Sequence, residues 1–292
     1  MKKSAYTLTN NHLSISINTK GAELSSIKRN EIEYLWQANP HVWNRHAPIL
    51  FPIVGRLIDH GYLHNDLKYT MGQHGFARDQ DFRMVDQMED SITFELRSTD
   101  ELLKVYPFDF ILQIKYTLLD SNVRVDYLVK NPSNKEDLLF SIGAHPAFNC
   151  PFEKGQQRDE YQLVFDKQIA QEAHLAENNL YDGDLSAPMN DQGIMELPNS
   201  VFDRGSLTFN PNPFSKVSFV HKPTGKKYLS VAFENYPYLA IWSVDDASPF
   251  ICIEPWHGLA DNVNHNQVLA DKEGIIRLGR GLEFGCFYTI EI

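Results

Sequence analysis

Residues 110–129, FILQIKYTLLDSNVRVDYLV, decide the fold class of this chain. Apolar side chains occupy every second position on both sides of the tetrad LDSN at 119–122, and this period is typical of a strand with one buried face. Asp, Ser and Asn favour turns, so the tetrad predicts the connection of a hairpin. The stretch therefore predicts two antiparallel, half-buried strands.

The same alternation recurs from one end of the chain to the other. It appears at residues 13–17, 92–96 and 229–233. A second turn sequence, KPTG at 222–225, links two further strands. Helical periodicity is scarce, although Thr99 predicts the cap of a short helix that Pro107 ends. We predict an all-β protein, a β-sandwich with few short helices.

The chain carries no sign of division into separate units. It has no Gly/Ser-rich or Pro-rich linker, no low-complexity tract and no aligned repeat, so we predict one domain over residues 1–292. Between residues 153 and 213, Asn, Asp, Pro and Gly are frequent. This composition predicts long loops there rather than a second core.

Composition excludes several functional classes. The 292 residues are 42% hydrophobic and 22% charged, which is ordinary for a globular protein, and the net charge of −11 opposes binding to nucleic acid. No apolar segment follows the N-terminal lysines, and the longest apolar run, APILFPIVG, contains two prolines, so we predict neither export nor membrane insertion. Cys150, Cys252 and Cys286 form no CxxC pair, which indicates a reducing cytoplasm and no zinc site built on thiolates.

The first segment that suits chemistry is ILFPIVGR at 49–56 together with GQHGFARD at 72–79. Gly55 lets the backbone turn before Arg56, and the glycines near His74 leave its imidazole uncrowded, so both side chains can face a ligand. The alternative is that His74 caps a loop while Arg56 and Arg78 pair with surface carboxylates.

The second segment is GAHPAF at 143–148. An apolar strand ends at Gly143, and Pro146 holds His145 in an extended conformation at the mouth of a sheet. The alternative for His145 is a buried histidine with a satisfied hydrogen bond. For Phe148 we expect packing in preference to lining a site.

The third segment is PFICIEPWHGLAD at 249–261. Alternation divides this strand into two faces, with Ile251 and Ile253 on one and Phe250, Cys252 and Glu254 on the other. Burial of an unpaired carboxylate is costly, so Glu254 either pairs with a cation such as Arg56 or serves as a base. Trp256 either stacks on the apolar face of a sugar ring or packs in the core, and we expect a structural role for His257.

Two histidines, a glutamate and an arginine at strand ends suit general acid–base chemistry on a polyhydroxylated substrate. Reference pKa values of about 4.3 for Glu and 6.5 for His allow a carboxylate to take a proton and an imidazole to give one near neutrality. A glycoside hydrolase needs two carboxylates, and the sequence offers one good candidate. A metal site at His74, His145 and Glu254 is less attractive because its two histidines form no close HxH or HxxxH pair, and we predict no metal.

The main alternative is a sugar-binding or sugar-sensing sandwich without turnover. Such a protein would use Trp256, Phe148 and Arg56, and it would tolerate the loss of Glu254. The presence of Glu254 together with both histidines favours an enzyme.

The segments GR, QHGFAR, GAHPAF and EPW, in this order, resemble the aldose 1-epimerase (galactose mutarotase) superfamily, and its LacX-like branch most of all. The resemblance spans most of the chain. It implies a large antiparallel β-supersandwich, no cofactor, and interconversion of the α and β anomers of an aldose.

The resemblance also implies roles for individual residues. Glu254 is implied to be the base that removes the proton of the anomeric hydroxyl, and His145 the acid that protonates the ring oxygen. His74 is implied to hydrogen-bond the ring oxygen or its neighbours, and Arg56 to bind hydroxyls or balance charge. Asp203, in VFDRGSL, lies where related enzymes place a sugar-binding aspartate.

Two departures bear on the substrate. GAHPAFN stands where the main galactose mutarotase branch has a histidine and a Tyr-Phe-Asn-Leu-like run, so a preference for galactose is not implied. HGFAR is similar to the glucose-6-phosphate 1-epimerase branch, whose arginines hold the phosphate, and Arg56 and Arg78 are candidates for that role. We expect a monomer or homodimer that acts on a hexose or hexose 6-phosphate and binds neither nucleic acid nor membrane.

Overall fold

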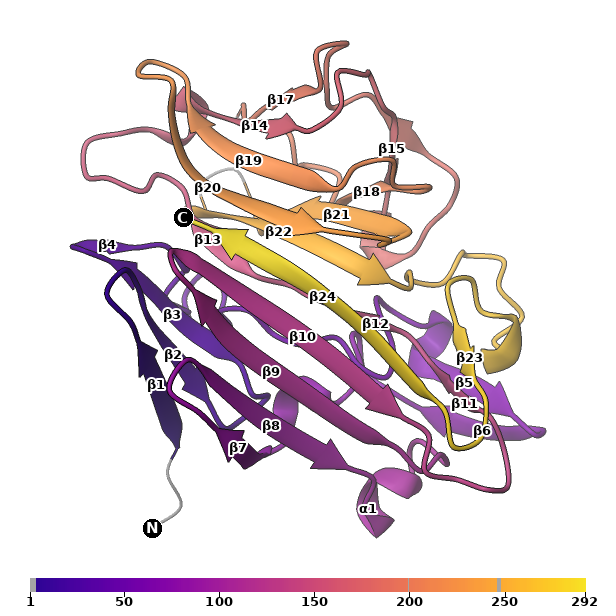
Figure 1. Ribbon diagram of the computed structural model, residues 1–292. Coiled ribbons are helices and arrows are strands. Elements are labelled where there is room, and N and C mark those ends of the chain that lie inside the picture. The colour runs from indigo at the N-terminus through magenta and orange to yellow at the C-terminus, as the bar shows by residue number, and fades with distance from the viewer. Residues whose placement is uncertain (1–3, 199, 246–247) are drawn as a thin grey trace.

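The hairpin at residues 110–129 forms as the alternation predicts in the computed structural model, which describes residues 4–198, 200–245 and 248–292 (Figure 1). Strand β9 (Ile111–Leu119) pairs antiparallel with β10 (Asn122–Lys130) along its whole length. Asp120 takes up a left-handed conformation, with φ of 53°, in the turn. Buried and half-buried side chains alternate along both strands, which confirms the prediction.

This hairpin lies inside a nine-stranded antiparallel sheet that crosses the front of Figure 1. In spatial order, its strands are β17 (Ile194–Glu196), β14 (Tyr161–Phe165), β19 (Lys216–His221), β20 (Lys226–Phe233), β24 (Glu283–Glu291), β10, β9, β8 (Ser91–Arg97) and β7 (Arg83–Gln87). The predicted turn at 222–225 joins β19 to β20.

A seven-stranded sheet carries the segments that the sequence singled out. Its strands are β12 (Ile142–Gly143), β22 (Phe250–His257), β21 (Tyr238–Trp242), β18 (Leu207–Phe209), β15 (Ala173–Leu175) and β16 (Leu185–Ser186), with β13 (Ala147–Asn149) also paired to β22. Because β12 and β13 pair with different parts of β22, the chain between them runs alongside the middle of that strand.

The remaining elements are small. They are a four-stranded sheet of β1 (Ala5–Thr9), β2 (Ser14–Asn18), β3 (Leu24–Arg29) and β4 (Ile32–Glu33), and the pairs β5 (Gly61–His64) with β6 (Leu67–Thr70) and β11 (Leu138–Phe140) with β23 (Ile276–Leu278). Short 3-10 turns are η1 (Ile58–His60), η2 (Ala77–Asp79), η3 (Arg158–Glu160), η4 (Glu177–Asn179) and η5 (Leu269–Asp271). The helix α1 (Asp100–Leu103) begins where predicted, because Thr99 Oγ1 accepts a hydrogen bond from Leu102 N–H. In the part of the chain described, no helix is long and apolar enough to cross a bilayer.

One large cluster of buried apolar side chains joins the sheets. It takes Ile17 from the four-stranded sheet, Leu112 and Val231 from the nine-stranded sheet, and Ile253 from β22. The sandwich class is therefore confirmed, as a supersandwich of large antiparallel sheets. A single domain over residues 1–292 stays our prediction, and this shared core supports it.

The prediction of long loops between residues 153 and 213 is wrong in part. Five short strands, β14 to β18, lie in this region, and the buried residues Leu163 and Phe209 belong to the same core cluster as the rest. These strands have two to five residues, too few for a period to show. Two of them form on the edges of longer strands, β14 on β19 and β18 on β21, and the other three pair with β14, β15 or β18. No second core was expected there, and these strands pack into the shared one.

Candidate active site

His145 and Glu254 are brought together by the register of the strands around β22. Gly143 pairs with Trp256 and Ala147 with Cys252, so His145 stands midway, opposite Glu254. Pro146 interrupts the ladder between β12 and β13, since it has no N–H to donate. The predicted faces of β22 are confirmed, because Ile251 and Ile253 enter the main core while Cys252 packs in a separate aromatic cluster on the other face.

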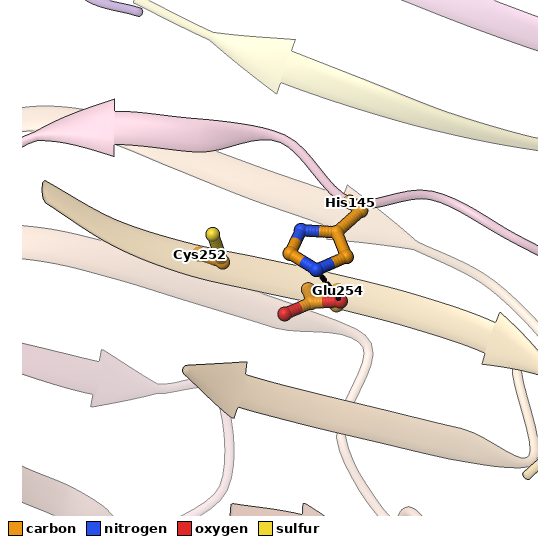
Figure 2. Close-up of side chains that lie close together, drawn as sticks. All are labelled: His145, Cys252 and Glu254. Carbon is orange, nitrogen blue, oxygen red and sulfur yellow. Dashed lines mark ion pairs between the residues drawn. The ribbon is translucent and has the colours of Figure 1, made fainter. Parts of the chain in front are cut away.

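The two groups form a buried acid–base pair (Figure 2). His145 Nε2 lies 3.3 Å from Glu254 Oε2, and the two side chains are only 7% and 1% exposed. Burial raises the pKa of Glu254 well above its usual value. Burial, helped by the charge of Arg78, lowers the pKa of His145 to about 3. Both shifts favour the arrangement in which Glu254 holds the proton and His145 is neutral.

His74 reaches the pair from the GQHGFARD segment. Its backbone has φ of 65°, and the following Gly75 is required because a Cβ there would lie 2.3 Å from Phe51 O. His74 Nδ1 accepts a hydrogen bond of 3.1 Å from Gly55 N–H, which leaves the proton of a neutral ring on Nε2. Burial lowers the pKa of His74 well below its usual value, so the ring is neutral. Its centroid is 5.5 Å from that of His145.

A cavity of about 460 Å³ opens over these groups, a volume suited to one small ligand. Of the residues that the sequence predicted for the site, His74, Arg78, His145, Glu254 and Trp256 line it. Trp256 is almost fully buried, and its indole N–H donates to Ala144 O. The structure therefore brings His74, His145 and Glu254 to one cavity, together with one of the two predicted arginines, Arg78.

The sequence did not point to two tryptophans and an arginine of this cavity. Trp43 stacks on His145 with ring centroids 5.0 Å apart, and Trp242 meets the same imidazole edge-on at 5.5 Å. Arg45 lines the cavity beside Arg78. Trp43 and Arg45 lie in NPHVWNRH at 39–46, which has neither a strand nor a helix period. Nothing in this stretch except the tryptophan itself indicated a site.

Arg45 and Arg78 make one end of the cavity positive. Arg45 Nη2 lies 3.0 Å from Asp79 Oδ1, and Arg78 Nε is 4.0 Å from Asp79 Oδ2, so two cations share one carboxylate. Arg78 also donates a 2.6 Å hydrogen bond to Gln73 O. Burial, and then the charge of Arg45, lower the pKa of Arg78 to about 10.

Four other candidates lie away from the cavity. Arg56 Nη1 donates to Asn178 O at 2.9 Å, and Asp203 is exposed, and neither side chain lines the cavity. The functions that the sequence suggested for these two stay predictions. Phe148 packs in the core against Phe219, as expected. His257 lies between the rings of Tyr236 and Phe284.

Histidines that lose contact with water on folding make stability depend on pH. Burial lowers the pKa of His257 to about 4, so below 6.5 the unfolded chain binds a proton that the folded protein does not. We expect the free energy of unfolding to fall by about 1.4 kcal/mol per pH unit for this histidine as pH drops from 6.5 to 4, and His74 adds to the loss. Urea unfolding of wild type and His257→Gln at pH 6.5 and 5.5 measures it. An equal decline in both proteins would contradict the assignment.

A large antiparallel supersandwich with a buried carboxyl–imidazole pair in a cavity for one small ligand defines a galactose mutarotase-like protein. The chain matches the aldose 1-epimerase family over residues 4–270. It is 34% identical over 280 residues to the chromosomal protein LacX of Lactococcus lactis subsp. lactis, with 93% of each chain covered, and equally to the plasmid form. This chain therefore belongs to the aldose 1-epimerase family, and the resemblance to its LacX-like branch is confirmed.

Solved structures agree with this assignment. A galactose mutarotase related enzyme from Lactobacillus acidophilus superimposes with a TM-score of 0.92 at 33% identity, covering 98% of this chain and 96% of that one. A galactose mutarotase-like protein from Lactobacillus casei gives 0.90 at 30% identity, covering 98% and 99%. A galactose 1-epimerase from Lactobacillus acidophilus shares the fold at 14% identity, with a TM-score of 0.68 and coverage of 98% and 92%.

Proposed function

We propose that this chain is a mutarotase, an isomerase that interconverts the α and β anomers of a hexose or hexose 6-phosphate. The observation that carries the proposal is the buried contact of 3.3 Å between His145 Nε2 and Glu254 Oε2 at a cavity of sugar size. Membership of the aldose 1-epimerase family supports it.

One proton shared by the pair is enough for the reaction. In the reacting form His145 is protonated and Glu254 is ionised. Glu254 takes the proton of the anomeric hydroxyl while His145 gives its proton to the ring oxygen, and the ring opens to the aldehyde. After rotation about the bond to the carbonyl carbon, His145 takes the proton back and Glu254 returns its own to the new anomeric oxygen. Bonds and protons balance, and the pair returns to its starting state.

Neighbouring side chains support this exchange. His74 is neutral with its proton on Nε2, so it can donate a hydrogen bond to the ring oxygen or a nearby hydroxyl without competing as an acid. Trp43 and Trp242 enclose the His145 imidazole on a face and an edge, which holds its direction and offers apolar surface to a sugar ring. Within the described residues, Glu254 is the sole carboxyl group of the cavity lining, which disfavours a two-carboxylate hydrolase.

The positive end of the cavity supports a phosphorylated substrate. Arg78 and Arg45 each contribute to lowering the pKa of His145, which makes the protonated acid harder to form. A phosphate bound by these arginines would offset their charge and favour protonation of His145. Substrate binding and preparation of the acid would then be coupled.

Anomer exchange measured by NMR saturation transfer tests the proposal. Glucose, galactose and their 6-phosphates are each examined with purified protein, with EDTA and without. We expect faster exchange on at least one sugar, unchanged by EDTA. Binding without any acceleration would instead establish the sugar-sensing alternative.

Removal of the Arg45 charge should affect the exchange of hexose 6-phosphates and of free hexoses differently. We expect Arg45→Ala to lower kcat/KM for the preferred hexose 6-phosphate by about 10-fold to 100-fold, because a charge-assisted hydrogen bond contributes roughly 1.5–3 kcal/mol. Exchange of the free hexose should not slow, because no phosphate contact is lost and His145 becomes easier to protonate. Arg277→Ala removes an exposed arginine that pairs with Asp137 outside the cavity, and it serves as the charge control. Equal losses on both sugars would count against a phosphate role.

A further inference from the structure

We propose that His145, Cys252 and Glu254 form a binding site for Zn²⁺ or a similar thiophilic divalent cation, and that its occupation stops anomer exchange. One nitrogen, sulfur or oxygen atom from each of the three lies within 4.8 Å of the others, and all three residues are buried. Figure 2 shows the His145 imidazole directed at the Glu254 carboxyl group. Cys252 lies near Glu254 on the same strand, β22. The inhibitory effect rests on the proposed function, whereas the site itself does not.

The donor atoms suit zinc. Imidazole nitrogen, thiolate sulfur and carboxylate oxygen are its usual ligands, at about 2.0–2.3 Å, so the side chains must close in by about 1 Å. Among the described residues, the buried Glu254 Oε2 has no hydrogen-bond partner. Unsatisfied polar atoms are costly in a buried site, and a cation can satisfy them. Three protein ligands leave a fourth position for water from the cavity.

Charge balance supports the same conclusion. Thiolate, carboxylate and neutral imidazole together cancel the two charges of the ion, so the occupied site is neutral. Neutrality matters here because Cys252 packs with Trp36 and Phe250, an apolar surrounding that disfavours any net charge. Binding releases the thiol proton and the proton shared by His145 and Glu254 to solvent.

Inhibition follows from the use of the same lone pairs. His145 and Glu254 must exchange protons with the sugar, and a cation bound to both prevents that exchange. The ion can reach them because both line the cavity, while Cys252 lies outside its lining. Cys252 therefore contributes to the metal site without contacting the substrate, so its removal separates metal binding from catalysis.

The experiment compares wild type with Cys252→Ser and the matched control Cys286→Ser, whose thiol is half-buried on β24. We expect Zn²⁺ to inhibit exchange in wild type and Cys286→Ser. Cys252→Ser should keep the metal-free rate and need at least about tenfold more Zn²⁺ for half inhibition, since even indirect ligand contacts change metal affinity by 10–100-fold. With Co²⁺, wild type and Cys286→Ser should show a thiolate-to-cobalt absorption band that Cys252→Ser lacks.

Equal inhibition of Cys252→Ser by Zn²⁺, or the absence of a cobalt band that depends on Cys252, would overturn the proposal. If wild type exchanges no sugar, the proposed function fails, and the cobalt band still decides whether the metal site exists. If wild type exchanges sugar and shows the cobalt band, but Zn²⁺ does not inhibit the exchange, the inhibitory role is refuted.

Discussion

Glu254→Gln is expected to lower kcat/KM for anomer exchange by about 10²–10⁴-fold, the range that general acid–base groups contribute. The substitution keeps the shape of the side chain but removes the proton acceptor. NMR exchange rates on the preferred sugar measure the loss. Retention of the wild-type rate would remove Glu254 from the mechanism.

The same variant should be more stable than wild type at neutral and alkaline pH. Burial raises the pKa of Glu254, so above about 4.3 the unfolded chain loses a proton that the folded protein retains. The stability of wild type therefore declines by about 1.4 kcal/mol per pH unit from this group, until pH passes the raised pKa. Glutamine has no such decline, so the advantage of Glu254→Gln should grow with pH in thermal unfolding.

Glu95→Gln is the matched control for a buried carboxylate. Burial acts to raise the pKa of Glu95, but hydrogen bonds from Arg97 and Gln113 outweigh it and lower the pKa. The stability that Glu95 contributes is fully present above its unfolded pKa and is lost as pH falls through its lowered folded pKa. This pH dependence is opposite to that of Glu254. Glu95→Gln should therefore lose stability at neutral pH and keep activity. If only Glu254→Gln loses activity and gains stability, Glu254 is a residue that serves function at a cost in stability.

His145→Gln has the second large expected effect, a loss of about 10²–10⁴-fold in kcat/KM, because the ring oxygen loses its proton donor. The control is His257→Gln, which removes a half-buried imidazole of lowered pKa at the end of β22, outside the cavity lining. It should exchange sugar at the wild-type rate.

Chemical rescue distinguishes an acid from a packing residue. His145→Ala leaves space beneath Trp43 and Trp242, and added imidazole should restore part of the exchange above the rate that imidazole gives without protein. A structural role for His145 predicts no rescue. Full activity of His145→Gln would contradict the proposed acid.

The fold class could be predicted because alternation is a local property. Residues 110–129 carry both strands and their turn, so no distant contact is needed to recognise the hairpin. The short strands β14 to β18 were missed because each forms only through pairing with another strand, such as β14 with β19, and that pairing depends on residues distant in the chain.

The site was predictable where glycine and proline mark it. Gly75 permits a left-handed backbone beside His74, Pro146 restricts the backbone beside His145, and strand alternation assigns a face to Glu254. Arg45 and Trp43 lack such marks, and only their position in space brings them to the cavity.

The sequence by itself determined the strands, their faces and the residue types available for acid–base chemistry, because these depend on neighbours a few positions away. Only the tertiary structure decided that the partner of Glu254 is His145 rather than Arg56. It also decided in which direction burial shifts the pKa of each member of that pair. Desolvation sets the raised pKa of Glu254 and the lowered pKa of His145, and the side chains that exclude water come from elements distant in the chain.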